Sequence, residues 1–160
     1  MIPAALTPQI AALGIALGLV FSLVCYLTTN LSPGGMITPG WLALTLVTDV
    51  QRALLVLAVT VLTYLATKAL QRAVILYGKR LFAAVVLSAV LIQMTVVIAL
   101  QQEFPLLWTS QTLGFIVPGL IAYQLVRQPK AATAIATGAV TLGTYVVLAA
   151  GLLLGALPTA

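Results

Sequence analysis

Few residues of this chain could carry out chemistry. Histidine is absent, the acidic residues are Asp49 and Glu103, and the cysteine is Cys25. General acid–base, nucleophilic and metal-dependent catalysis all draw on clusters of such side chains. The phosphate-binding pattern GxxxxGK[ST] does not occur either. We therefore expect no catalytic residue, no metal site and no cofactor, and hence a protein that is not an enzyme by itself.

The isolated acids and the cysteine have structural interpretations. Asp49 is expected to cap a helix that starts at Val50, with Arg52 three residues further on. A buried acid in a proton relay is the alternative for Asp49. Glu103 is assigned to an outer loop beside Trp108, which is typical of an interfacial anchor. Cys25 is interpreted as a small core residue, since a single cysteine has no disulfide partner within the chain.

The composition is that of a membrane protein. Hydrophobic residues make up 62% of the chain and charged residues 6%, with a mean hydropathy of +1.21. A water-soluble surface needs roughly a quarter of its residues charged. Residues 1–9 lack basic side chains, so no cleaved signal peptide is expected. The sequence predicts an all-α integral membrane protein, with residues 1–160 forming a single transmembrane domain. The long uncharged runs are 11–27, 53–66, 81–100 and 131–157.

The basic residues predict the orientation in the membrane. They gather around two connections and should be cytoplasmic by the positive-inside rule. Two shorter apolar segments, 36–48 and 113–126, can either cross the bilayer or re-enter it. Crossing gives six spans with both termini outside and fits the charges better than four spans with re-entrant segments. The residues at the two connections are Lys68, Arg72, Lys79 and Arg80, then Arg127 and Lys130.

The short segments resemble one another. Residues 35–43 read GMITPGWLA and residues 114–122 read GFIVPGLIA. Each is followed by a polar break and a long apolar run containing VTVLTY at 59–64 or VTLGTY at 140–145. The chain is therefore interpreted as two repeats, about 9–70 and 81–157, each a long transmembrane helix, a short Pro-Gly-broken segment and another long helix. With three crossings each, the repeats would be inverted, as in secondary transporters.

The Pro-Gly breaks are the first candidate site. Proline interrupts helical hydrogen bonding, and Pro-Gly suits a type II turn with positive φ at glycine. Backbone groups freed in this way must be buried in protein or line a cavity. Two interpretations stay open: kinks that allow close helix packing, or a path or subunit interface shared by the two breaks. The residues concerned are Gly35, Pro39, Gly40, Gly114, Pro118 and Gly119.

Three segments carry a family resemblance. They read SPGGMITPGWLAL at 32–44, LTYLATKALQRAVILYGKRLF at 62–82 and GFIVPGLIAYQLVRQ at 114–128. Together they resemble the PgsC/CapC family, the membrane proteins of bacterial poly-γ-glutamate biosynthesis. Tyr123, where a polar amide is expected, and Pro129, where a glycine commonly follows, depart from the family pattern.

The resemblance implies a non-catalytic, multi-pass subunit in the bacterial cytoplasmic membrane that acts in capsule biosynthesis. Its implied partners are a PgsB/CapB-like ATP-dependent amide ligase, a PgsA/CapA-like export subunit, the lipid bilayer and the acidic polymer. A homo-oligomer is left open, and no nucleic acid is expected. The alternatives are a stand-alone small transporter or channel, and a pure membrane anchor for the ligase. The second candidate site is a surface for the ligase or the polyanion: Lys68, Arg72, Lys79, Arg80, Arg127 and Lys130.

Overall fold

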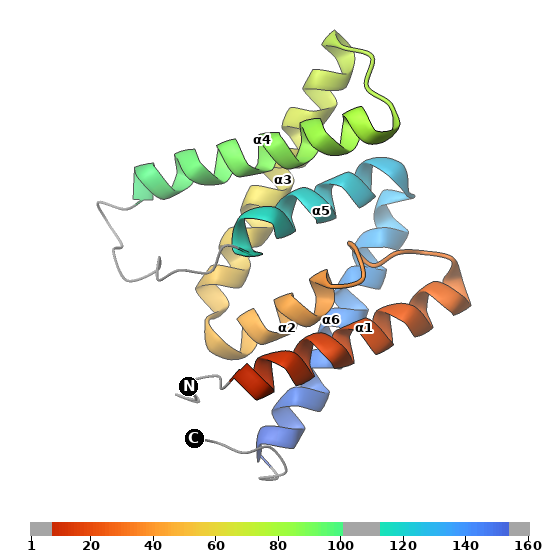
Figure 1. The fold of residues 1–160 in the computed structure, drawn as a ribbon, viewed down its shortest axis with the longest axis vertical. Coiled ribbons are helices and arrows are strands. Elements are labelled where there is room, and N and C mark those ends of the chain that lie inside the picture. Colours follow the sequence, from red (N-terminus) through yellow and green to blue (C-terminus); the bar gives the residue numbers. More distant parts are fainter. Residues whose placement is uncertain (1–7, 101–112, 154–160) are drawn as a thin grey trace. The chain divides into compact units, whose positions relative to one another are not determined.

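The computed structural model describes residues 8–100 and 113–153, and these form α-helices without a strand (Figure 1). The predictions about Glu103 and Trp108 fall outside the described residues. The all-α prediction is confirmed. The helices are α1 (Pro8–Thr29), α2 (Thr38–Thr48), α3 (Val50–Ala73), α4 (Gly78–Leu100), α5 (Leu113–Arg127) and α6 (Lys130–Leu153).

Four of these helices are long and apolar enough to cross a membrane, namely α1, α3, α4 and α6. Each exceeds or approaches the ~20 residues that span ~30 Å of hydrocarbon. Their leucines and valines are largely exposed: Leu27 keeps 72% of its accessible surface and Leu54 60%. An apolar helix surface of this extent is suited to lipid rather than to water. The chain is thus a multi-pass membrane protein.

The helix ends follow local chemistry. Asn30 closes α1 with a left-handed φ of 55°, and its N–H donates to the Tyr26 carbonyl over 2.8 Å. The Asp49 carboxylate accepts a hydrogen bond of 2.9 Å from the Gln51 N–H and lies 3.3 Å from Arg52 Nε. These contacts confirm Asp49 as the cap of α3. Gly78 begins α4 with φ 55°, so the chain turns directly ahead of Lys79.

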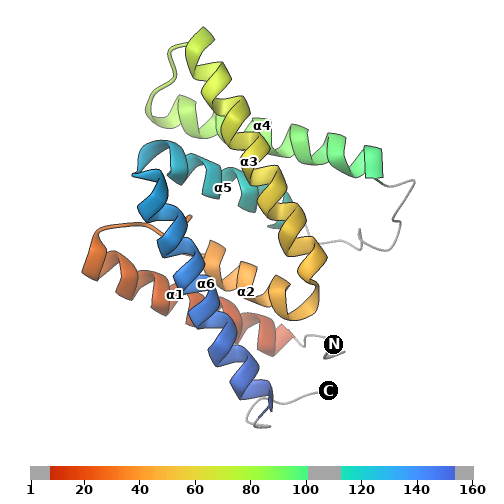
Figure 2. The same ribbon diagram turned by 180° about the vertical axis from the view of Figure 1, so that it is seen from behind.

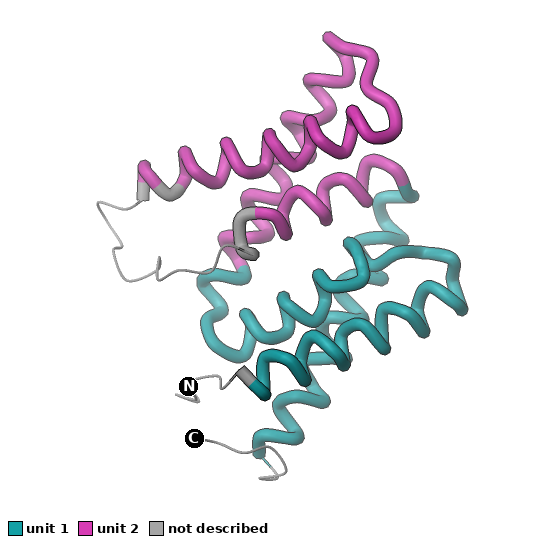
Figure 3. The backbone as a smooth tube through the Cα atoms, in the orientation of Figure 1, with its two compact units in different colours: residues 1–53, 128–160 teal, residues 54–127 magenta. Residues whose placement is uncertain are grey.

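The helices divide into two compact units (Figure 3). Unit 1 comprises residues 1–53 and 128–160, and unit 2 comprises residues 54–127. Unit 1 therefore joins α1 and α2 to α6, whereas unit 2 joins α4 and α5 to most of α3. Each unit takes two helices from one proposed repeat and its third helix from the other. The inverted-repeat interpretation itself remains a prediction.

In unit 1, α1 and α2 lie side by side and α6 crosses them, behind in Figure 1 and in front in Figure 2. Gly40 of α2 lies beside Gly18, and Leu44 lies beside Gly14. The two helices are therefore antiparallel, and α2 runs from the middle of α1 to its beginning. Ala43, Leu44 and Leu148 form the apolar core of this unit.

In unit 2, α5 lies along α4 in the same antiparallel sense. Gly119 lies beside Ala89 and Val86, and Ala122 packs with Val85 and Leu81 near the start of α4. Tyr64 from α3 packs against the same cluster. This arrangement brings the end of α5 to the beginning of α4.

Candidate functional site

The first Pro-Gly break lies ahead of a helix rather than within one. Pro39 stands in the first turn of α2, where its missing N–H removes no helical hydrogen bond. The turn before it contains the left-handed residues Gly34 (φ 64°) and Gly35 (φ 102°). The buried Thr38 hydroxyl donates to the Gly34 carbonyl over 2.8 Å and holds the turn against the helix.

The second break differs, because Pro118 lies inside α5. Helix continues on both sides of this proline, so the predicted type II turn does not form there. The expectation of positive φ at Gly40 and Gly119 is wrong as well. Both glycines lie in helices, and among the described glycines the left-handed ones are Gly34, Gly35 and Gly78. Pro118 still leaves the carbonyl four residues earlier, that of Gly114, without its helical donor.

Gly40 and Gly119 instead allow their helices to approach the preceding helix. A Cβ on Gly40 would lie 2.9 Å from the Gly14 carbonyl oxygen and 3.0 Å from Ile15 Cα. A Cβ on Gly119 would lie 3.0 Å from Ala89 Cβ and 3.2 Å from Val86 Cα. Close backbone approach through small residues is how membrane helices gain packing energy.

The two glycine contacts have the same register. Gly40 faces residues 14, 15 and 18 of α1, and Gly119 faces residues 85, 86 and 89 of α4. Each set has the spacing i, i+1, i+4. The similarity of the Pro-Gly sequences is therefore accompanied by equivalent packing, each within its own unit.

The second candidate site lies at one end of unit 2. Leu76 and Leu81, on either side of the α3–α4 turn, pack with Tyr123 and Val126 from the last turns of α5. The α3–α4 connection, the start of α4 and the end of α5 are thereby held together. Five exposed cations occupy this end, which we call the basic end: Lys68, Arg72, Lys79, Arg80 and Arg127.

Tyr123 orients Arg127 within the basic end. Arg127 Nη1 donates to the Tyr123 hydroxyl over 3.0 Å, and the guanidinium carbon lies 5.5 Å from the centre of the tyrosine ring. Phe82 meets the same ring edge-on, with centroids 5.2 Å apart and planes at 84°. Tyr123 thus contacts the guanidinium through both its hydroxyl and its ring, Phe82 packs against that ring, and Arg127 stays exposed.

Lys130, the sixth residue of the predicted basic surface, begins α6 and belongs to unit 1. The preceding connection is fixed to the turn after α1. When the side-chain amide of Gln128 is flipped, its nitrogen donates to the Ser32 carbonyl at 3.1 Å and its oxygen accepts from the Ser32 N–H at 3.2 Å. The α1–α2 and α5–α6 connections therefore lie at the same end of unit 1.

Several residues of interest were not singled out as site residues from the sequence. The structure adds Tyr123, whose spacing of four from Arg127 on one helix was an available signal. It also adds Ser22, Gln93 and Thr141, which are buried polar side chains on membrane helices. Their signal was simply a polar residue inside an apolar run.

The chain was compared with known proteins. A family model described as "Capsule biosynthesis CapC" matches residues 17–134. The PGA biosynthesis protein CapC of Bacillus subtilis (strain 168) is 35% identical over 121 residues, which is 72% of this chain and 78% of that protein. The capsule biosynthesis protein CapC of Bacillus anthracis is 33% identical over 121 residues, with the same coverage. No solved structure matches.

Proposed function

The chain belongs to the CapC family of capsule biosynthesis proteins, and on that premise we propose that it is the membrane subunit of a bacterial poly-γ-glutamate synthase and export complex. In this role it docks a cytoplasmic ATP-dependent amide ligase, cooperates with an export subunit and helps the anionic polymer across the cytoplasmic membrane. The ligase carries the peptide-bond chemistry, and this chain is non-catalytic.

The observation that carries the proposal is the basic end of unit 2. Five exposed cations come from the last turns of α3, the start of α4 and the end of α5, and the other described residues of the unit carry no charge. A polymer with one carboxylate per residue is attracted to such a surface, which raises its local concentration. Arg127 is oriented by Tyr123, so this part of the surface is preorganised for a carboxylate.

The helix arrangement supports a six-span topology. In each unit the short helix begins beside the middle of its long neighbour and runs to that neighbour's first residues. In unit 1 the connection before α2 therefore returns from the far end of α1 to its middle. We propose that α2 and α5, together with the connections before them, each cross the membrane once. The basic end then faces the cytoplasm, where the ligase would act.

Charge removal at the basic end tests the proposal. A strain that lacks its own C subunit is complemented with Lys79→Gln/Arg80→Gln, with Tyr123→Phe or with the wild-type chain, and extracellular poly-γ-glutamate is measured. We expect a steep loss for the double variant. Tyr123→Phe should lower the amount of extracellular polymer about two- to fivefold, because it removes one charge-assisted hydrogen bond but keeps the ring.

The control for the double variant is Arg52→Gln, which removes a charge outside the basic end. The control for Tyr123→Phe is Tyr77→Phe, which alters an exposed tyrosine in the α3–α4 connection. Both should sustain wild-type output. Co-purification of the ligase separates docking from polymer handling. Wild-type output from the double variant at normal protein levels would contradict a role for the basic end. Polymer transport by the chain alone in liposomes would favour a stand-alone transporter. Synthesis sustained by an unrelated helix hairpin carrying residues 68–80 would favour a pure anchor.

A further inference from the structure

Three buried side chains have a polar atom without a hydrogen-bond partner among the described residues. They are Ser22 Oγ, Gln93 Oε1 and Thr141 Oγ1, on residues that are 0%, 5% and 5% exposed. Arg52 Nε shares this condition but lies 3.3 Å from the Asp49 carboxylate. An unsatisfied polar atom inside a membrane protein is costly, because no water reaches it there. Such an atom calls for an explanation, and an absent ligand is one.

Ser22 lies at the first Pro-Gly break. Gly14, Gly18 and Ser22 share one face of α1, and the two glycines pack against α2. Because α2 is antiparallel to α1 and Gly18 lies beside Gly40, Ser22 is level with the residues just before Pro39. The unpaired N–H groups of a helix start point in that direction. The buried Ser22 side chain therefore lies at the level of the α2 N-terminus.

Gln93 lies at the second break in the same register. It follows Ala89 by four residues, as Ser22 follows Gly18, and Ala89 packs against Gly119 as Gly18 packs against Gly40. Because α5 is antiparallel to α4, Gln93 is level with the turn of α5 that precedes Pro118. This is the turn in which Pro118 leaves a backbone carbonyl unpaired. Each break thus has one unpartnered, buried side chain at the equivalent position.

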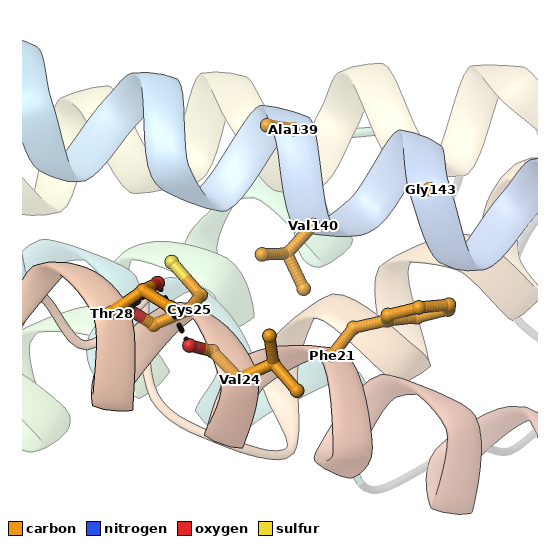
Figure 4. A pocket seen from close by; sticks show the side chains of 7 residues that line it. All are labelled: Phe21, Val24, Cys25, Thr28, Ala139, Val140 and Gly143. Carbon is orange, nitrogen blue, oxygen red and sulfur yellow. Dashed lines mark hydrogen bonds between the residues drawn. The ribbon is translucent and has the colours of Figure 1, made fainter.

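Thr141 adds a second hydroxyl at the first break. Its neighbour Val140 faces Phe21, Val24 and Cys25 across a pocket of about 310 Å³ between α1 and α6 (Figure 4). Thr141 is therefore at the same level along α1 as Ser22. Its counterpart in the VTVLTY segment, Thr60, donates to the Val56 carbonyl over 2.7 Å. The same hydrogen bond is open to Thr141 but is not formed.

The unpartnered atoms define the chemistry of the ligand. Gln93 Oε1 accepts and needs an N–H donor, whereas the hydroxyls of Ser22 and Thr141 can donate to a carbonyl or carboxylate. We propose that the two Pro-Gly breaks are subsites for the backbone amide groups of a γ-linked polyamide, with Ser22 and Thr141 at one break and Gln93 at the other. This inference rests on the proposed function and names the residues that would contact the passing polymer.

The test compares two readouts on the full chain: polymer output in the complemented strain, and thermal unfolding in nanodiscs with a γ-linked glutamate pentamer as probe. The variants are Ser22→Ala, Thr141→Val and Gln93→Met. We expect the probe to raise the unfolding midpoint of the wild type. Each variant should weaken probe binding about tenfold, the equivalent of one hydrogen bond, and lower polymer output. Ligase co-purification should be unchanged.

Thr60→Val and Ser88→Ala are matched controls, because their hydroxyls already donate to the Val56 and Ala84 carbonyls. Both should bind the probe as the wild type does. If the unpartnered atoms are only packing imperfections, their apolar replacements will raise stability and leave output and probe binding unchanged. That result overturns the subsites. A chain that binds the probe through these residues but is dispensable for polymer production would overturn the proposed function and leave the subsites standing.

Discussion

At the residue scale, Gly40 and Gly119 matter because the absence of a side chain lets a neighbouring helix come close. Their conformation is ordinary helix, and the space for a methyl group is taken by the backbone of the preceding helix in one unit and by Ala89 and Val86 in the other. This is the packing interpretation of the two glycines. The polar groups available at the breaks are then the neighbouring side chains of Ser22, Thr141 and Gln93.

Gly40→Ala should destabilise the protein by about 1–3 kcal/mol, because the added Cβ meets backbone atoms of Gly14 and Ile15 that cannot move aside easily. Thermal unfolding in detergent measures the change. Gly138→Ala is the matched control: it lies in α6 with nothing within 4 Å of an added Cβ. The free energy of unfolding of this control should rise by about 0.5–1 kcal/mol, because alanine favours a helix more than glycine does. Equal stability of the two variants would contradict the close contact.

The sequence predicted the basic residues as a surface but could not show how they are held. In the structure Gly78, with its positive φ, starts α4 and places Lys79 and Arg80 in the first turn of that helix. The cluster that joins this turn to Val126 and Tyr123 brings together residues more than forty positions apart. Spacing along the chain carries no trace of such a contact. The contact of Tyr123 with Phe82 depends on that pairing and was equally out of reach.

At the element scale, the helices themselves were predictable. Long uncharged runs predicted α1, α3, α4 and α6, and the cap at Asp49 followed from local chemistry. The conformation at the Pro-Gly pairs was not predictable in this way. Proline in a first helical turn, proline inside a helix and a type II turn all fit the same dipeptide locally. The packing against α1 and α4 decides between them.

The two prolines should therefore respond differently to substitution. Pro118→Ala restores an N–H inside α5 and should stabilise that helix, whereas Pro39→Ala should be nearly neutral because that N–H has no helical acceptor. The new N–H at residue 118 also pairs with the carbonyl in the turn level with Gln93, so under the proposed subsite polymer output should fall in Pro118→Ala. Thermal unfolding and extracellular polymer are measured together. Raised stability with full output would leave the break without a role in transport.

At the scale of the whole molecule, the topology can be tested directly. In a Cys25→Ser background, cysteines at Gly78 and Gln128 should react with a membrane-impermeant maleimide only from the cytoplasmic side. A cysteine at Gln102, which lies outside the described residues, should react only from the external side. The reason is that α4 and α5 are antiparallel neighbours, so the end of α5 returns to the start of α4. Labelling of Gln128 from outside while Gly78 labels from inside would instead indicate re-entrant segments.

The composition of the two units has a consequence for biogenesis. Unit 2 is one continuous stretch of chain, so its helices can associate as soon as residue 127 has entered the bilayer. Unit 1 must wait for α6, which the ribosome delivers last. Until then α1 and α2 are held together by their own packing, in which Gly18 lies beside Gly40 and Gly14 beside Leu44, without the cover of α6. The helices that enter the membrane first therefore complete their packing last. Chaperones or partner subunits can bind α1 and α2 during that interval.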